Sequence, residues 1–129
     1  MVRTAERRDP GLLEVALEAA AAGASVLREQ FRSESLRVTA KGPNDLVSSA
    51  DHAAEAAIAE VLRGHFPESS LLGEESGRTG PQGALEWVVD PLDGTNNFLQ
   101  GLPIFCTSVA GCIDGSPVVG VVHEPLSGV

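Results

Sequence analysis

Hydrophobic residues near the start of the chain recur at intervals of three and four, the spacing of one apolar stripe along an α-helix. The stripe consists of Leu13, Leu17, Ala20, Ala24, Leu27 and Phe31. Asp9-Pro10 just before it has the form of an N-cap followed by proline at the first helical position. These features predict a long first helix.

A second helical stripe follows a capping signal at Ser48. Ser48 and Asp51 have the spacing of a capping box, and Gly64 and Pro67 are the expected stop signals. The apolar positions between them are Ala54, Ile58, Val61 and Leu62. We therefore predict a second helix between these limits.

The remaining apolar runs are short and rich in β-branched residues, which is typical of strands. Short strands are expected at 35–40 and 69–73, with a Gly-Pro-Asn loop at 41–47 between the first of them and the second helix. Trp87-Val88-Val89 predicts a buried strand that ends at Asp90. Two further β-rich runs flank an Asp-Gly-Ser turn at 114–116, a strong hairpin signal.

The order of these elements predicts the fold class. Two helices come first, followed by short strands and a meander, which indicates an α+β fold with two N-terminal helices packed on a largely antiparallel sheet. The length of 129 residues fits one domain.

Charge and composition narrow the partners and the location. Nine basic residues face eighteen acidic ones, and the net charge of −9 argues against nucleic acid and anionic membranes as partners. The start of the chain lacks the apolar segment of a signal peptide, and the apolar runs are shorter than the ~20 residues of a membrane span. On one strand Cys106 and Cys112 would lie ~20 Å apart, too far for a disulfide. Reduced thiols favour a cytoplasmic location.

Acidic residues gather where the predicted elements begin or end. Asp51 lies at a helix start, Glu74 and Glu75 follow one strand, and Asp90 and Asp93 follow another. A single acidic residue at such a place is commonly a helix cap or a solvated turn residue.

Asp90 is different, because it leaves a buried run, where a carboxylate costs free energy unless something neutralises it. Basic residues are sparse nearby, and carboxylate and carbonyl oxygens suit Mg²⁺ or Mn²⁺. The Leu92 carbonyl could add a third oxygen to Asp90 and Asp93. The amides of Gly94 and Thr95 are suited to phosphate oxygens.

Other ligand motifs fit the chain less well. The D-x-x-D-G spacing is not that of an EF-hand loop, and the chain has no P-loop motif. His52, His65 and His123 have no paired spacing, which makes a zinc site a poor fit.

Several motifs together resemble the inositol monophosphatase family of Mg²⁺-dependent, lithium-sensitive phosphatases. They are GEES at 73–76, WVVDPLDGTNNF at 87–98, GLP and SVA within 101–110, and NDLVSSAD at 44–51. The resemblance implies that the chain is the N-terminal half of a layered αβαβα sugar-phosphatase fold. It also implies Mg²⁺ as cofactor, with two or three ions in the full-length family, and Li⁺ as inhibitor. Members of this family often form dimers, so a homodimer of the full-length form is an open option.

The resemblance carries metal-binding roles to particular positions. Glu74, Asp90, the Leu92 carbonyl and Asp93 match the residues that ligate the metals. Glu75 resembles the position that holds a more weakly bound outer ion.

It also implies catalytic and substrate-binding roles. Asp51 and Thr95 resemble the pair that orients or deprotonates the attacking water, with Glu74 assisting through the metal. Gly94 and Thr95 would bind the phosphate through their amides. Lys41 matches a lysine near the metal site, without an assigned role.

One family motif is absent. No W-D-x-A-A-G sequence occurs in the chain, and in the family this motif supplies a ligand for a second metal. We therefore expect residues 1–129 to be the N-terminal metal-binding domain, with the C-terminal domain missing and the activity of the isolated chain open.

The expected reaction is Mg²⁺-dependent hydrolysis of a small phosphate monoester by a metal-activated water. Inositol monophosphate is the first candidate substrate, which the DGTNNF sequence favours. Fructose 1,6-bisphosphate, histidinol phosphate and a nucleotide 3′-phosphate remain alternatives, as does a non-catalytic metal-binding remnant.

Overall fold

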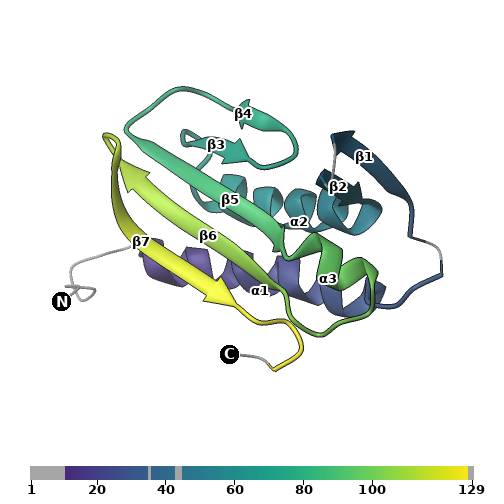
Figure 1. Ribbon diagram of the computed structural model, residues 1–129. Helices are drawn as coiled ribbons and strands as arrows, with labels where there is room; N and C mark the ends of the chain where they lie inside the picture. Colours follow the sequence, from purple (N-terminus) through teal and green to yellow (C-terminus); the bar gives the residue numbers. More distant parts are fainter. Residues whose placement is uncertain (1–10, 35, 43–44, 128–129) are drawn as a thin grey trace.

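The computed structural model describes residues 11–34, 36–42 and 45–127, and for 39–42 and 45–47 it describes the backbone alone (Figure 1). Two long helices cover one face of a five-stranded sheet, and a small two-stranded sheet lies beside them. The predicted α+β class is therefore confirmed.

The two long helices are α1 (Leu12–Gln30) and α2 (Ser49–His65). Small residues line the buried side of α1, and a Cβ added at Gly23 would lie 2.7 Å from Ile58 Cδ1 on α2. This close approach explains the alanine-rich sequence of α1. The predicted cap at Asp9-Pro10 lies outside the described residues, and Gly11 is the N-cap of α1.

The larger sheet has β5 at its centre, and its strand order is β4-β3-β5-β6-β7. Its strands are β3 (Ser70–Gly73), β4 (Gly77–Thr79), β5 (Leu85–Asp93), β6 (Cys106–Ile113) and β7 (Ser116–His123). All neighbours are antiparallel except β3 and β5, which are parallel. The prediction of a largely antiparallel sheet holds, with this one exception.

The parallel pair matters for the site. The chain leaves β3, forms β4, and returns through 80–84 to the same end of the sheet before β5 begins, so the carboxyl ends of β3 and β5 lie side by side. Gly73 pairs with Val89, and the Glu74 amide donates to the Val89 carbonyl at 3.1 Å. The turn after β3 is thereby fixed next to Asp90.

Four local predictions were wrong. Leu13 and Leu17, predicted on the apolar stripe of the first helix, are exposed, because α1 buries the neighbouring face that carries Val15, Ala16 and Ala19. Residues 41–47 are largely strand, because β1 (Val38–Gly42) and β2 (Asp45–Ser48) satisfy each other's backbone groups in an antiparallel hairpin. The strand predicted to end at Asp90 continues to Asp93, with an irregular register between them. Gly64 is still helical, and α2 ends one residue later at His65.

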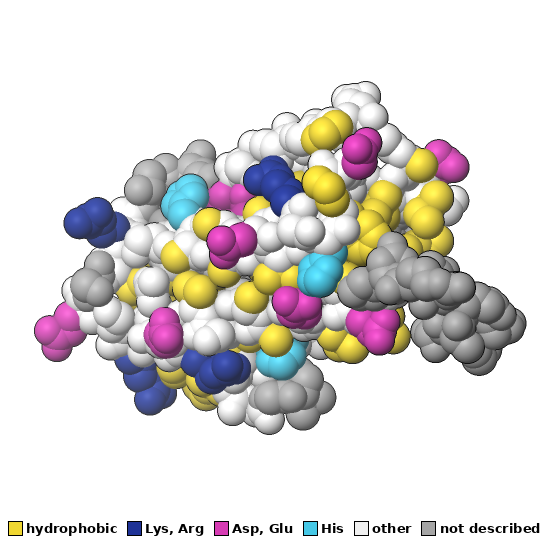
Figure 2. All heavy atoms as spheres, turned by 180° about the vertical axis from the view of Figure 1, so that it is seen from behind, with side chains coloured by type: hydrophobic (Ala, Val, Ile, Leu, Met, Phe, Trp, Pro, Cys, Tyr) yellow, Lys and Arg dark blue, Asp and Glu magenta, His cyan; other side chains and the backbone are white. Residues whose placement is uncertain are grey.

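The core lies between the helices and the sheet. Trp87, Val89 and Val109 point toward the helices and are almost fully buried, whereas Val88 and Val122 on the opposite face are exposed. On the side seen in Figure 2, acidic and basic side chains of the described residues are interspersed. No described helix combines the length and the apolarity needed to cross a membrane.

Candidate active site

The site begins where β5 leaves the sheet. Asp90 follows Val89 on the opposite face of the strand and is half-buried, and Leu92 then turns into the core, where it is 3% exposed. Gly94 has a φ of 100° and is the N-cap of the short helix α3 (Thr95–Leu99). A Cβ at Gly94 would lie 2.9 Å from the Ile104 carbonyl, so both the backbone angle and the available space require glycine.

Asp51 is brought to this turn by the first turn of α2. Its Oδ1 accepts hydrogen bonds from the Ser48 amide at 2.7 Å and the Ser48 hydroxyl at 2.5 Å, which confirms the predicted capping box. Its Oδ2 accepts a hydrogen bond from the Thr95 hydroxyl at 3.1 Å. Asp51 is 1% exposed, so its carboxylate is fixed by these contacts rather than solvated.

The Thr95 hydroxyl has a second acceptor within reach. Its Oγ lies 3.2 Å from the Leu92 carbonyl, in addition to the Asp51 carboxylate. One hydroxyl carries one proton, so it donates to one of the two at a time. When that proton goes to Asp51, the oxygen keeps its lone pairs for a third group, such as a water molecule.

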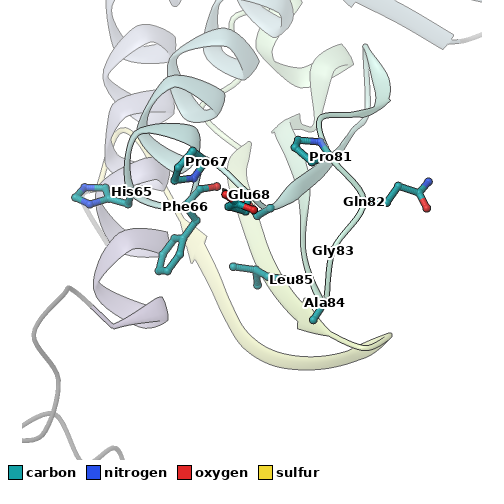
Figure 3. A pocket seen from close by; sticks show the side chains of 10 residues that line it. His65, Phe66, Pro67, Glu68, Pro81, Gln82, Gly83, Ala84 and Leu85 are labelled. Atoms are coloured by element: carbon teal, nitrogen blue, oxygen red, sulfur yellow. Dashed lines mark hydrogen bonds between the residues drawn. The ribbon is translucent and has the colours of Figure 1, made fainter.

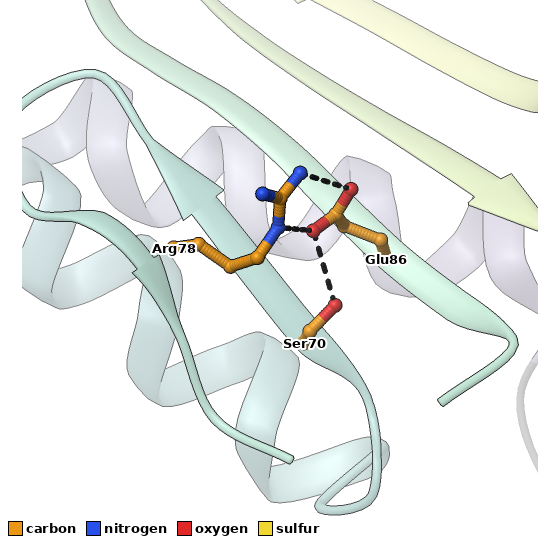
Figure 4. Close-up of polar contacts among 3 residues, drawn as sticks. All are labelled: Ser70, Arg78 and Glu86. Carbon is orange, nitrogen blue, oxygen red and sulfur yellow. Dashed lines mark hydrogen bonds and ion pairs between the residues drawn. The ribbon is translucent and has the colours of Figure 1, made fainter. Parts of the chain in front are cut away.

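Electrostatics distinguishes Asp90 from an ordinary surface acid. Burial, followed by the nearby charges of Glu74, Asp93 and Asp51, raises the pKa of Asp90 from 3.8 to about 6, against an opposing hydrogen bond from the Leu92 backbone. Arg78 does not neutralise this charge, because it forms an ion pair with Glu86 at 2.6 Å, and Ser70 also donates to Glu86 (Figure 4).

Glu55 is a site residue that the sequence reasoning missed. It lies one helical turn after Asp51 on α2, and its carboxylate, 6% exposed, accepts hydrogen bonds from the backbone of the turn that carries Glu74 and Glu75. The available signal was an acidic residue on an otherwise alanine-rich helix, four positions after the predicted capping acid.

The donor set fits a hard divalent cation. The charges of Glu74 after β3, Asp51 on α2 and Asp93 on β5 act on Asp90. The Leu92 carbonyl lies in the same turn, 3.2 Å from the Thr95 hydroxyl. All these donors are oxygen, the type that Mg²⁺ prefers. Within the described residues, no three acidic, histidine or cysteine side chains are close enough to form a preassembled metal site.

The other residues near the site are Glu75, Lys41 and Cys106. Glu75 is half-buried beside Glu74, and Lys41 lies on β1 with its side chain outside the described residues. The Cys106 thiol lies 3.9 Å from Asp93 Oδ2, and burial together with the charge of Asp93 raises its pKa. Both cysteines are free thiols on β6, as predicted.

One cavity among the described residues lies away from this chemistry. A cavity of about 500 Å³ is lined by 65–69 after α2 and by 81–85 at the start of β5 (Figure 3). Asp51 and Asp90 lie toward the opposite ends of these two elements. The cavity is therefore not part of the carboxylate site.

Known proteins resemble this chain over nearly its whole length. A family model described as the inositol monophosphatase family matches residues 10–129. The chain belongs to this family. The membership predicted from the motifs around Asp90 is thereby confirmed.

Two curated relatives illustrate the match. A protein named Nus factor SuhB from Pasteurella multocida (strain Pm70) is 41% identical over 117 residues, which cover 89% of this chain and 44% of the relative. A protein named fructose-1,6-bisphosphatase/inositol-1-monophosphatase from Aquifex aeolicus (strain VF5) is 44% identical over 115 residues, covering 88% of this chain and 43% of the relative. The chain thus spans less than half the length of these two relatives.

Two solved structures have the same fold. The extragenic suppressor protein suhB from Bartonella henselae matches with a TM-score of 0.88 and 37% identity, covering 91% of this chain and 46% of that one. Inositol monophosphatase from Anabaena (Nostoc) sp. PCC 7120 matches with a TM-score of 0.73 and 38% identity, covering 90% and 40%.

Proposed function

We propose that this chain is the metal-binding part of a Mg²⁺-dependent phosphatase that hydrolyses a small phosphate monoester, with inositol monophosphate as the first candidate. The observation that carries the proposal is the geometry of the turn after β5: the Asp51 carboxylate from α2 accepts the Thr95 hydroxyl at 3.1 Å, beside Asp90, whose pKa is raised by burial and by the charges of Glu74, Asp93 and Asp51. Such a concentration of negative charge at the end of a strand costs free energy unless it is neutralised, and a bound divalent cation would neutralise it.

The residues that would hold Mg²⁺ are Glu74, Asp90, Asp93 and the Leu92 carbonyl, with Glu75 at an outer position. When bound, the cation would offset their charge, polarise the phosphoryl group and assist the leaving oxygen. Mn²⁺ is a further candidate for the same oxygen donors.

Asp51 and Thr95 would act on the attacking water. With its proton donated to Asp51 Oδ2, the Thr95 oxygen can accept a hydrogen bond from the attacking water. If Thr95 takes a proton from that water, its own hydroxyl proton passes to Asp51, which is the final proton acceptor. Ser48 occupies Oδ1 of Asp51 with two hydrogen bonds, so the orientation of the carboxylate is fixed before substrate arrives.

The phosphate would be held by the backbone around Gly94 and Thr95. The amides of Gly94 and Thr95 lie at the start of α3, where the first amides of a helix have no helical partner, and the glycine would allow a ligand to approach the backbone closely. We propose a small phosphorylated substrate as the partner, rather than nucleic acid or a membrane, and a cytoplasmic location.

The test is Mg²⁺-dependent phosphate release by two proteins: the purified chain, and the chain fused to the remaining C-terminal part of the Aquifex aeolicus relative. The chain covers only 43% of that relative. Release from the fusion but not from the chain would support both the function and the prediction of an incomplete domain. Release from the chain alone would refute incompleteness, and no release from either would overturn the function.

The substrate panel should include fructose 1,6-bisphosphate beside inositol monophosphate. A relative 44% identical to this chain is named for both activities. Histidinol phosphate and a nucleotide 3′-phosphate complete the panel, because the motif around Thr95 leaves them open.

A further inference from the structure

We propose that Glu55 is a positioning residue that fixes the Glu74–Glu75 turn against α2 and so sets the affinity of the site for its cation. The proposal rests on the proposed function, since it concerns the same carboxylates. Glu55 would not touch the cation or the substrate and would act only through the turn.

The first observation is that both oxygens of the Glu55 carboxylate accept hydrogen bonds from the turn. Oε1 accepts the Glu75 amide at 2.9 Å, and Oε2 accepts the Ser76 amide at 3.2 Å and the Ser76 hydroxyl at 2.5 Å. Both oxygens therefore bind the turn between β3 and β4. A nearly buried carboxylate with three donors is a costly arrangement to lose, because each donor would be left without its partner.

The second observation is that the Glu55 carboxylate packs directly against the glycine that precedes the turn. A Cβ added at Gly73 would lie 2.6 Å from the Glu55 carboxyl carbon. The bare glycine backbone is what allows the carboxylate to reach the amides beyond it. The Glu55 carboxylate thus packs against Gly73 before the turn and binds the amides of Glu75 and Ser76 within it.

The third observation is that the turn is held at two points. The Glu74 amide donates to Val89 on β5, and the following amides donate to Glu55 on α2. Glu74 therefore lies between β5, which carries Asp90, and the helix that carries Asp51. Residues 51 and 55 are four apart and share one face of α2, so one rigid element positions groups on both sides of the site.

The experiment compares Glu55→Gln with Glu60→Gln, which makes the same charge change at an exposed position of the same helix. An amide at position 55 has one accepting oxygen in place of two, so in either orientation its NH₂ group faces a donor of Glu75 or of Ser76. Glu55→Asp keeps the charge with a shorter side chain, and Ser76→Ala removes only the hydroxyl donor.

Two properties are measured on each purified chain. Amide hydrogen exchange of Glu75 and Ser76 is followed without metal, and Mn²⁺ binding is followed by titration, with the melting temperature as a check on folding. We expect Glu55→Gln to lose protection at both amides and to bind Mn²⁺ about 10- to 100-fold more weakly, the effect found for groups that orient metal ligands. Glu60→Gln should change neither property, and Glu55→Asp and Ser76→Ala should fall between.

The outcomes separate this inference from the proposed function. Unchanged exchange at both amides in Glu55→Gln would overturn the positioning role, whatever the metal does. Lost protection with unchanged Mn²⁺ affinity would overturn it too, because Glu55 would then only stabilise a turn. No Mn²⁺ binding by the wild-type chain would overturn the metal site itself, and with it the effect of Glu55 on affinity.

Discussion

Replacing Asp90 with asparagine should stabilise the metal-free protein while abolishing its response to Mg²⁺. The pKa of Asp90 is raised from 3.8 to about 6, so its ionised form is unfavourable in the folded state. The folded protein therefore keeps this proton up to a higher pH than the unfolded chain does. Protonated Asp90 therefore contributes to the free energy of unfolding. This contribution is complete below pH 3.8 and is lost as the pH rises through about 6, where Asp90 ionises in the folded state.

The size of the effect follows from this difference in pKa. At about 1.4 kcal/mol per pKa unit, the difference corresponds to a ceiling of about 3 kcal/mol at neutral pH. Asp90 is only half-buried, and water screens part of the repulsion, which reduces the expected gain to about 1–2 kcal/mol. Asparagine keeps an oxygen that can accept the Leu92 amide, so the turn should survive the change.

The assay is urea unfolding with a chelator between pH 4 and 8. Asp90→Asn should exceed the wild type by this amount at pH 7.5, and the difference should shrink toward pH 4. Added Mg²⁺ should raise the free energy of unfolding of the wild type only, because a ligand stabilises the state that binds it. Asp114→Asn is the matched control: Asp114 is exposed and has a φ of 51°, which asparagine tolerates.

The reasoning would be refuted if Asp90→Asn were less stable than the wild type at pH 7.5 without metal. Equal stabilisation of both proteins by Mg²⁺ would also contradict it, since the cation would then bind elsewhere.

Three further substitutions test other parts of the site. Gly94→Ala should lower the free energy of unfolding in urea by about 1–3 kcal/mol, more than Gly115→Ala does. Both glycines have a positive φ, but only at Gly94 would an added Cβ lie within 2.9 Å of a carbonyl oxygen. Equal losses in the two variants would show that this close approach is unimportant. Gly73→Ala should displace the Glu55 carboxylate and weaken Mn²⁺ binding in a titration, and unchanged binding would mean that the turn adapts freely. Thr95→Val should lower kcat about 100-fold or more with little change in KM, measured as phosphate release by whichever form is active; a rise in KM alone would assign Thr95 to substrate binding.

The sequence pattern predicted those parts of the fold that depend on neighbours along the chain. The hairpin at Asp114-Gly115 formed as expected, because both residues tolerate the positive φ values of 51° and 83° that they adopt. The capping box at Ser48 is equally local. The parallel pairing of β3 with β5 was not predicted, because it depends on the return path through 80–84 and not on the composition of either strand.

For the site too, only the part that is contiguous in the sequence could be predicted. The turn from Asp90 to Thr95 is contiguous, so its chemistry could be read from its order of residues. Glu55 could not be found in this way, because a glutamate on an alanine-rich helix is usually a solvated residue. Its burial depends on amides of Glu75 and Ser76, twenty and more positions later in the chain, reaching its carboxylate.

The position of α2 therefore affects the chemistry of the site as a whole. Asp51 on its first turn binds Thr95, and Glu55 on the next turn binds the segment after β3. The same helix packs on the core through Ile58, which lies against Gly23 of α1. Because interiors are closely packed and transmit strain, a small displacement of α2 would move Asp51 and strain the Glu74–Glu75 turn, which is bonded both to Glu55 on α2 and to Val89 on β5. A substitution at Ile58 would then affect both the proposed water-orienting pair, Asp51 and Thr95, and the proposed cation ligands Glu74 and Glu75, whereas a substitution at Asp93 would affect only the proposed ligands.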